Sequence, residues 1–409
     1  MTKKTDTPAI RFKGFSDTWE QRKLTEFVEF FSGLTYTPND VQENGTLVLR
    51  SSNVSNGEVV DADNVYVNPQ VVNSENVKVG DIVVVVRNGS RSLIGKHAQI
   101  KAFMPNTVIG AFMTGIRSEC PEFTNALLNT SRFEEEIAMN MGATINQITG
   151  YMFSKMEFKV PCLDEQKKIG EYFEKLDNLI TLHQRKYEKL HNIKKSMLEK
   201  MFPKNGSNVP EIRFKGFTEA WEQRKFSELV QIERGGSPRP IDDFITDAPN
   251  GLNWVKIGDA PTQGNYITKT AEKIRPEGLS KTREVHPGDL ILSNSMSFGK
   301  PYIMGIDGCI HDGWLLIRNT YGVFDLTFLC HLLGTPQMLS QYRSLAAGST
   351  VNNLNKELVG NTYVTIPSIT EQRVLGAYLE QLDNLITLHQ RELEKLQNIK
   401  KSMLEKMFV

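Results

Sequence analysis

The side chains of this 409-residue chain that are best suited to chemistry are hydrogen-bonding groups beside positive charges. Between residues 78 and 101, six Lys, Arg and His side chains accompany a single acid, Asp81, with Asn, Ser and Gln among them. Arg, Asn, Ser and Gln can hydrogen bond to the edges of DNA bases, whereas Lys and Arg can pair with phosphates. The candidates that this pattern selects are Arg87, Asn88, Ser90, Arg91 and Lys96.

A second stretch of the same kind lies in the other half of the chain. Each stretch begins at the end of an apolar run, "DIVVVV" (81–86) or "DLILSN" (289–294), so we expect both at the ends of equivalent strands. A basic, glycine-rich segment, "RGGSPRP" (234–240), adds two arginines to the second set. A solvated polar loop has a similar composition, so the hypothesis of a nucleic-acid contact depends on the equivalence of the two loops. The second set of candidates is Arg234, Arg239, Ser293, Asn294, Ser295 and Lys300.

Known catalytic motifs are absent from the sequence. It has no G-x-x-x-x-G-K-[ST] phosphate loop and no G-x-S-x-G elbow. It also lacks the Asn/Asp-Pro-Pro-aromatic tetrapeptide and the F-x-G-x-G cofactor loop of amino-methyltransferases. The histidines at 286, 311 and 331 do not have the spacing of metal ligands. We therefore expect no catalytic residue and no metal site, although an active site assembled from distant segments remains an alternative.

The bulk composition describes an ordinary protein of more than one domain. Lys plus Arg equals Asp plus Glu, 48 each, so a charged partner has to be argued from local charge. No run of eighteen apolar residues occurs, and the first ten residues lack the apolar core of a secretory signal. The four cysteines lie far apart and are expected to be reduced, buried thiols: Cys120, Cys162, Cys309 and Cys330. These features predict a cytoplasmic protein.

The chain consists of two copies of one plan. "IRFKGFSDTWEQRK" (10–23) returns as "IRFKGFTEAWEQRK" (212–225), with 11 of 14 positions identical. Residues 164–202 return as 370–408, with 29 of 39 identical, and both copies contain "LDNLITLHQR". Between these copies lie the first insert (24–163) and the second insert (226–369), which share little sequence. The period is far longer than that of a solenoid, so each half is a full domain with a tail.

The repeated tail is predicted to be a long helix. Apolar residues follow a heptad seam in both copies, and Pro203 ends the first one. Asp164 and Thr370 are the expected capping residues, with Glu165 and Glu371 in the first turn. Because one helix alone would leave its seam in water, the two copies should pair, and the order of the repeats makes that pair antiparallel. His183 and His389 share one seam position, where they act as polar register residues or, alternatively, in a metal or catalytic site.

The inserts combine short strand-like runs bounded by Gly, Asn, Asp and Pro with short helices. The expected fold is α+β, with two domains of mixed strands and helices separated by two long antiparallel helices. These helices form a coiled coil with pseudo-two-fold symmetry. The expected boundaries are 1–160 for domain one, 161–203 for the first helix, 204–366 for domain two and 367–409 for the second helix.

These features together resemble the specificity subunits of type I restriction-modification systems. The resemblance is carried by the helix starts at 160–166 and 366–372, the twin "LDNLITLHQR" helices and the "IRFKGF…WEQRK" segments. It covers essentially the whole chain. In that family each variable insert is a target-recognition domain that recognises one half of a split DNA site. The constant helices set the gap between the halves and dock two methyltransferase subunits.

The resemblance implies a non-catalytic subunit that binds double-stranded DNA and no cofactor of its own. S-adenosylmethionine would belong to the methyltransferase subunits, and ATP with Mg would belong to two restriction subunits that can join the complex. The repeated outer faces of the helices suggest docking residues: Asp177, Gln184, Arg185, Asp383, Gln390 and Arg391. Recent duplication would also produce identical faces. The alternative functions are a coiled-coil adaptor with two protein-binding domains and an enzyme with unrecognised motifs.

Overall fold

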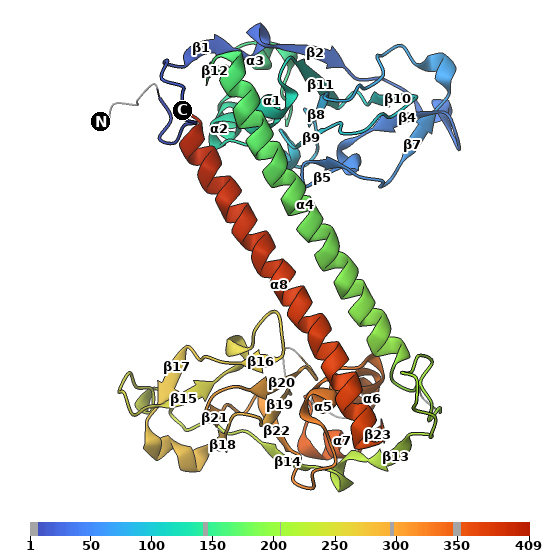
Figure 1. Cartoon of the computed structure of the whole chain (residues 1–409), viewed down its shortest axis with the longest axis vertical. Helices are drawn as coiled ribbons and strands as arrows, with labels where there is room; N and C mark the ends of the chain where they lie inside the picture. Colours follow the sequence, from blue (N-terminus) through green and yellow to red (C-terminus); the bar gives the residue numbers. More distant parts are fainter. Residues whose placement is uncertain (1–6, 142–145, 205, 295–297, 347–352) are drawn as a thin grey trace. The chain divides into compact units, whose positions relative to one another are not determined.

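The computed structural model describes residues 7–141, 146–204, 206–294, 298–346 and 353–409. The chain forms two compact units, one of Met1–Leu182 with Leu393–Val409 and one of His183–Glu392. Each unit therefore combines one insert with a stretch of both long helices, α4 (Leu163–Lys200) and α8 (Ile369–Met407) (Figure 1). The predicted fold class, mixed domains with two long antiparallel helices, is confirmed.

The two helices pair through their seams and through equivalent ion pairs in each unit. Phe173 and Leu176 of α4 are buried in the first unit, as are Leu379 and Leu382 of α8 in the second unit. In the first unit, Lys400 Nζ lies 2.7 Å from Asp177 Oδ1, and in the second unit Lys194 pairs with Asp383. Because these pairs occupy the same positions of the repeat, one set of residues fixes the antiparallel register in both units.

Both helices begin two residues earlier than the predicted capping residues imply, at Leu163 and Ile369. The N–H groups of Glu165 and Gln166 donate to the carbonyl of Cys162, and the Glu371 N–H donates to Ser368 Oγ at 3.4 Å. The expected capping residues Asp164 and Thr370 are therefore wrong, because they lie inside the first turn. Their types suit a cap, but the chain already turns into the helix directly after the proline.

The first-turn glutamates are buried in charge-assisted hydrogen bonds. Arg11 donates to both oxygens of Glu165, at 2.7 and 2.8 Å, and Arg213 donates to both oxygens of Glu371, each at 2.7 Å. Glu165 and Glu371 are 0% and 3% exposed. The hydrogen bond with Glu371 raises the pKa of Arg213 above its ordinary value. These bidentate pairs fasten each "IRFKGF" segment to the start of the long helix in its own unit.

The C-terminal end of each long helix is held by the "IRFKGF" segment of the unit in which that helix ends. The N–H of Ile10 donates to the carbonyl of Lys406 at 2.9 Å, and the N–H of Ile212 donates to the carbonyl of Lys200 at 2.9 Å. Phe408 stacks on Phe123, with ring centroids 5.6 Å apart, as Phe202 stacks on Phe328 at 5.6 Å. The repeated "MLEKMF" therefore docks the helix end onto the insert of the same unit.

The first insert contains two four-stranded sheets. One has the order β2 (Val28–Ser32), β11 (Met113–Ser118), β8 (Ile82–Val85), β9 (His97–Gln99). The other has the order β10 (Thr107–Ile109), β4 (Thr46–Leu49), β7 (Val65–Val67), β3 (Val41–Gln42). Three short helices follow: α1 (Pro121–Leu128), α2 (Ser131–Asn140) and α3 (Gly150–Phe153). β1 (Glu20–Lys23) pairs with β12 (Glu157–Val160), which closes the insert on the repeated segment.

The second insert repeats this plan although its sequence differs. Its first sheet has the order β14 (Gln231–Arg234), β22 (Trp314–Arg318), β19 (Leu290–Ser293), β20 (Pro301–Met304), β16 (Tyr266–Ile267). Its second sheet has the order β17 (Glu272–Ile274), β15 (Leu252–Val255), β21 (Gly308–Ile310), β18 (Arg283–Val285). The helices are α5 (Leu326–Leu333), α6 (Pro336–Ala346) and α7 (Lys356–Gly360). β13 (Glu222–Lys225) pairs with β23 (Tyr363–Ile366).

The central strands are apolar on both faces because each separates two cores. Ile82 and Val84 of β8 pack toward the helices, whereas Val83 and Val85 join the core beneath the other sheet. Ile291 of β19 likewise faces the second sheet of its insert. Alternating side chains of a strand point to opposite faces, so a run such as "IVVV" has no polar face. The polar residues that follow each run therefore lie at the end of a central strand.

Two further predictions from composition can be compared with the structure. Cys120, Cys309 and Cys330 are buried, but Cys162 is exposed at the start of α4, so its predicted burial is wrong. Within the described residues, no helix is both long and apolar enough to cross a membrane.

The Arg213–Glu371 pair should be a large contributor to the stability of the second unit. Replacing Glu371 by Ala leaves a nearly buried guanidinium without its carboxylate, which should lower the free energy of unfolding by about 3 kcal/mol. Chemical denaturation of the full chain measures this loss. The control is Glu174→Ala on the solvent-exposed face of α4, which should change stability little. Equal effects of the two substitutions would contradict a structural role for the buried pair.

Candidate nucleic-acid interface

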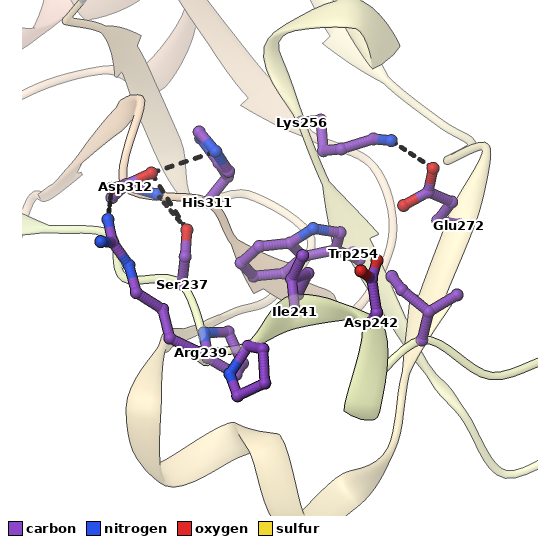
Figure 2. A pocket seen from close by; sticks show the side chains of 12 residues that line it. Ser237, Arg239, Ile241, Asp242, Trp254, Lys256, Glu272, His311 and Asp312 are labelled. Carbon is purple, nitrogen blue, oxygen red and sulfur yellow. Dashed lines mark hydrogen bonds and ion pairs between the residues drawn. The ribbon is translucent and has the colours of Figure 1, made fainter.

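The basic segment "RGGSPRP" lines an open groove in the second insert, which we call the second groove. Its volume is about 1360 Å³, and it lies between residues 237–242, the strand β15 and the turn at 311–312 (Figure 2). The two glycines permit close backbone contact. A Cβ on Gly235 would lie 2.2 Å from the carbonyl oxygen of His311, and one on Gly236 would lie 2.5 Å from that of Lys281. Backbone approach, rather than phosphate binding, explains this glycine pair.

The carboxylate of Asp312 contacts three side chains in the second groove. Its Oδ1 accepts a hydrogen bond from Ser237 Oγ at 3.0 Å and lies 3.0 Å from His311 Nε2. Its Oδ2 lies 3.8 Å from Arg239 Nη2 (Figure 2). The Arg239 side chain is 84% exposed, so most of its donors face solvent. The groove thus presents a guanidinium beside a carboxylate that is held by the insert itself.

The floor of the second groove is aromatic, and the wall opposite Asp312 carries an ion pair. Trp254 is 1% exposed, and its ring meets the His311 ring edge-on with centroids 5.8 Å apart. Lys256 and Glu272 form an ion pair on the opposite wall (Figure 2). A buried aromatic floor between charged walls can hold the polar edge of a ligand in a fixed direction.

The first insert has an equivalent hollow, the first groove, of about 570 Å³. Residues 34–36 and 110–113 line it, and a Cβ on Gly33 would lie 2.0 Å from the carbonyl oxygen of Gly110. Arg50 and Lys256 also match, because each N–H donates to a side chain three residues ahead, Asn53 or Asp259. The two grooves therefore occupy the same place in the two copies of the fold.

The chemistry of the first groove differs from that of the second. Phe112 is 56% exposed, and the Arg87 guanidinium lies over its ring, 5.0 Å from the centroid. Ala111 and Gly110 stand where the second groove has Asp312 and His311, because both pairs follow the strand that runs parallel to β4 or β15. Equivalent grooves with different linings can recognise different ligands.

Two candidates of the first insert, Arg87 and Asn88, contact residues that line this groove. Arg87, Ser90 and Arg91 are exposed, and Lys96 is half-buried. Asn88 donates to Ser51 Oγ at 3.1 Å and accepts from the Ser90 N–H at 2.9 Å, so it orders the loop. Ser51 lines the first groove, which connects the predicted loop to it.

The candidates of the second insert divide into exposed and buried residues. Arg234 and Lys300 are exposed, and the Lys300 ammonium lies over the Tyr302 ring at 5.0 Å. Ser293 and Asn294 are only 0% and 3% exposed. Asn294 donates to the carbonyl of Asp312 at 2.8 Å, so it supports the second groove from beneath. Ser295 lies outside the described residues.

On the long helices, several predicted docking residues take part in contacts within a unit. Asp177 and Asp383 form the interhelical ion pairs described above, and Asp383 also accepts from Asn265 Nδ2 at 2.8 Å. Gln184 donates to Glu188 at 2.6 Å. Arg185 and Arg391 are exposed, and Gln390 is half-buried. Helix pairing therefore explains why the two aspartates recur in the repeat.

Exposed leucines on the same helices were missed by the sequence analysis. Leu179 and Leu182 are each 46% exposed, and Leu385 and Leu388 are 43% and 52% exposed. They occupy the same two positions of the repeated "LDNLITLHQR". Their recurrence outside the heptad seam was the available signal, since exposed leucines have no role in the pairing of the two helices.

His183 and His389 meet in the second unit. Their Nδ1 atoms are 3.1 Å apart, and the rings are edge-on with centroids 5.1 Å apart. Burial and the neighbouring His183 lower the pKa of His389. No group of three or more His, Cys, Asp and Glu side chains that could hold a metal ion occurs in the part of the chain that the structure describes. The two histidines therefore meet at the seam position that they share in the repeat.

Comparison with known proteins gives consistent matches. The family model described as type I restriction modification DNA specificity domain matches residues 16–192 and 218–398. The MjaVIII specificity subunit of Methanocaldococcus jannaschii is 26% identical over 281 residues, which is 64% of each chain. The chain thus spans less than two thirds of that relative's length. The StySPI specificity subunit of Salmonella potsdam is 29% identical over 172 residues, 40% of this chain and 36% of the relative.

The fold also matches a solved structure. The crystal structure of the type I restriction-modification S subunit from M. genitalium superimposes with a TM-score of 0.68 at 14% sequence identity. The match covers 98% of this chain and 99% of that one. At this identity the likeness concerns the fold alone.

Proposed function

This chain belongs to the family of type I restriction modification DNA specificity domains, of which it carries two copies, and we propose that it is the DNA-recognition subunit of such a system. Each insert recognises one half of a bipartite double-stranded site. The long helices set the gap between the half-sites and dock the methyltransferase subunits. The complex works in the cytoplasm.

One observation carries this proposal: the two inserts share a fold and a groove position but differ in the residues that line the groove. Arg87 and Phe112 mark the first groove, whereas Arg239, His311 and Asp312 mark the second. A subunit that recognises two different sequences needs a constant scaffold with variable contact residues. A protein-binding adaptor, the alternative function, would explain the paired helices, but no feature of the grooves favours it.

The chemistry of methyl transfer is assigned to the partners. S-adenosylmethionine is bound by methyltransferase subunits and ATP with Mg by restriction subunits, since the sequence of this chain has no motif for either. This chain would then recognise the DNA and hold the other subunits together.

The exposed leucine pairs are proposed as part of the docking surface for two methyltransferase subunits. Leu179 with Leu182, and Leu385 with Leu388, present the same apolar pair in each unit. Leucines at such exposure gain free energy when a partner covers them. Arg185 and Arg391 follow each pair within two turns and are exposed, so they remain candidates for polar contacts at the rim. Gln184 and Gln390 are candidates of the same kind.

Substitution of one leucine pair should remove one methyltransferase subunit. The double variant Leu179→Ser with Leu182→Ser should co-purify with one copy where the unaltered chain carries two, because the second pair is intact. Native mass spectrometry of the complex counts the copies. Lys189→Ala, an exposed residue of the same helix, is the control and should retain both. Retention of two copies by the double variant would exclude the leucines from docking.

The recognition function is tested by mapping methylated adenines in the genome of a host that expresses this chain with its methyltransferase. We expect one asymmetric, split sequence whose two halves differ, since the two grooves differ. A host without this chain should lose those marks. Methylation at a single uninterrupted sequence, or marks that persist without the chain, would contradict the proposal.

A further inference from the structure

We propose that Arg239 recognises a guanine in the half-site of the second insert, and that Asp312 is the positioning residue that directs its guanidinium. The inference rests on the proposed function and names the base that is recognised, guanine, and the side chain that recognises it, Arg239. It follows from the way in which the two oxygens of Asp312 are used.

The carboxylate of Asp312 is fixed by the insert before any ligand binds. Oδ1 receives Ser237 Oγ at 3.0 Å and His311 Nε2 at 3.0 Å. In return, the Asp312 N–H donates to Ser237 Oγ at 3.4 Å. Oδ2 is thereby left to face Arg239, at 3.8 Å from Nη2. The carboxylate of Asp312 therefore acts as a fixed acceptor beside the exposed guanidinium of Arg239.

The ring of His311 is held in one orientation beside that acceptor. The Gly313 N–H donates to His311 Nδ1 at 2.8 Å, so Nδ1 is the acceptor nitrogen of the ring. Nε2 is then the donor nitrogen, and it donates to Asp312 Oδ1. His311 therefore occupies Oδ1 and leaves Oδ2 directed at the guanidinium.

The backbone also restricts Arg239. It lies between Pro238 and Pro240, each of which fixes its own φ angle and limits its neighbour. Its side chain is 84% exposed and lines the groove, so the guanidinium is presented to a ligand there. An ion pair at 3.8 Å in solvent is weak, so the donors remain free for a ligand.

Guanine is the base that fits such a group. Its O6 and N7 in the major groove accept two parallel hydrogen bonds from the planar fork of an arginine. A phosphate contact does not require a fixed direction of approach, whereas a base edge does. The first insert has Thr37 in place of Arg239 and Ala111 in place of Asp312, so its half-site is recognised by other residues.

The test uses the full chain in complex with its methyltransferase subunits. Methyl transfer is measured on duplexes in which each position of either half-site is varied in turn. The variants are Arg239→Ala, Arg239→Lys and Asp312→Asn. The control is Arg275→Ala, which removes an equal charge from an exposed arginine of the same insert outside the groove.

Arg239→Ala should reduce discrimination at one guanine position of the second half-site by about 10- to 100-fold. Arg239→Lys should relax the same position, because lysine keeps the charge but lacks the fork. Asp312→Asn retains two hydrogen-bonding atoms and should relax that position without lowering the thermal unfolding midpoint. The first half-site should be unchanged in all three, and Arg275→Ala should leave both half-sites unchanged.

Two outcomes would overturn the inference while leaving the proposed function intact. One is a uniform loss of activity on all sequences together with a salt dependence reduced by about one unit, which is the signature of a phosphate contact. The other is unaltered discrimination at every position of the second half-site. If the unaltered complex itself showed no base preference, the proposed function would fail as well.

Discussion

The buried pairing of an arginine with the first-turn glutamate of a long helix is the interaction on which each unit depends. Arg11 with Glu165, and Arg213 with Glu371, join two parts of a unit: the repeated segment that precedes the insert and the long helix that follows it. Because a carboxylate without exposure needs its partner, neither residue can change alone. The same segment holds the end of the other helix through a backbone hydrogen bond. A constant frame therefore surrounds each insert.

Within that frame, the insert can vary wherever the strands and the closing contacts are kept. The central strands require only apolar residues on both faces, as the differing runs in β8 and β19 show. The groove lies at the ends of strands of the other sheet, β4 and β10 in the first insert and β15 and β21 in the second, where side chains meet solvent instead of a core. The two inserts differ in the residues that line the groove, whereas the residues that pair the helices are the same in both copies.

Much of the fold follows from local pattern, whereas the site depends on long-range contacts. The heptad seam and the strand ends could be predicted, because their signals lie within a few residues. The burial of Ser293 and Asn294 could not, since a polar strand end looks the same whether another turn covers it or not. The approach of Arg239 to Asp312 joins segments distant in sequence and has no periodic signal. Asp164 has a side chain that suits a cap, but the helix already begins at Leu163, two residues after Pro161.

The central claim is that a constant frame carries two independent recognition domains. Exchanging residues 24–160 for the matching insert of a relative, with both repeated segments kept, tests this claim most directly. Sequencing of methylated adenines should then show a new first half-site, an unchanged second half-site and the same gap between them. A change in both half-sites would contradict the account, because the inserts would then not recognise DNA independently.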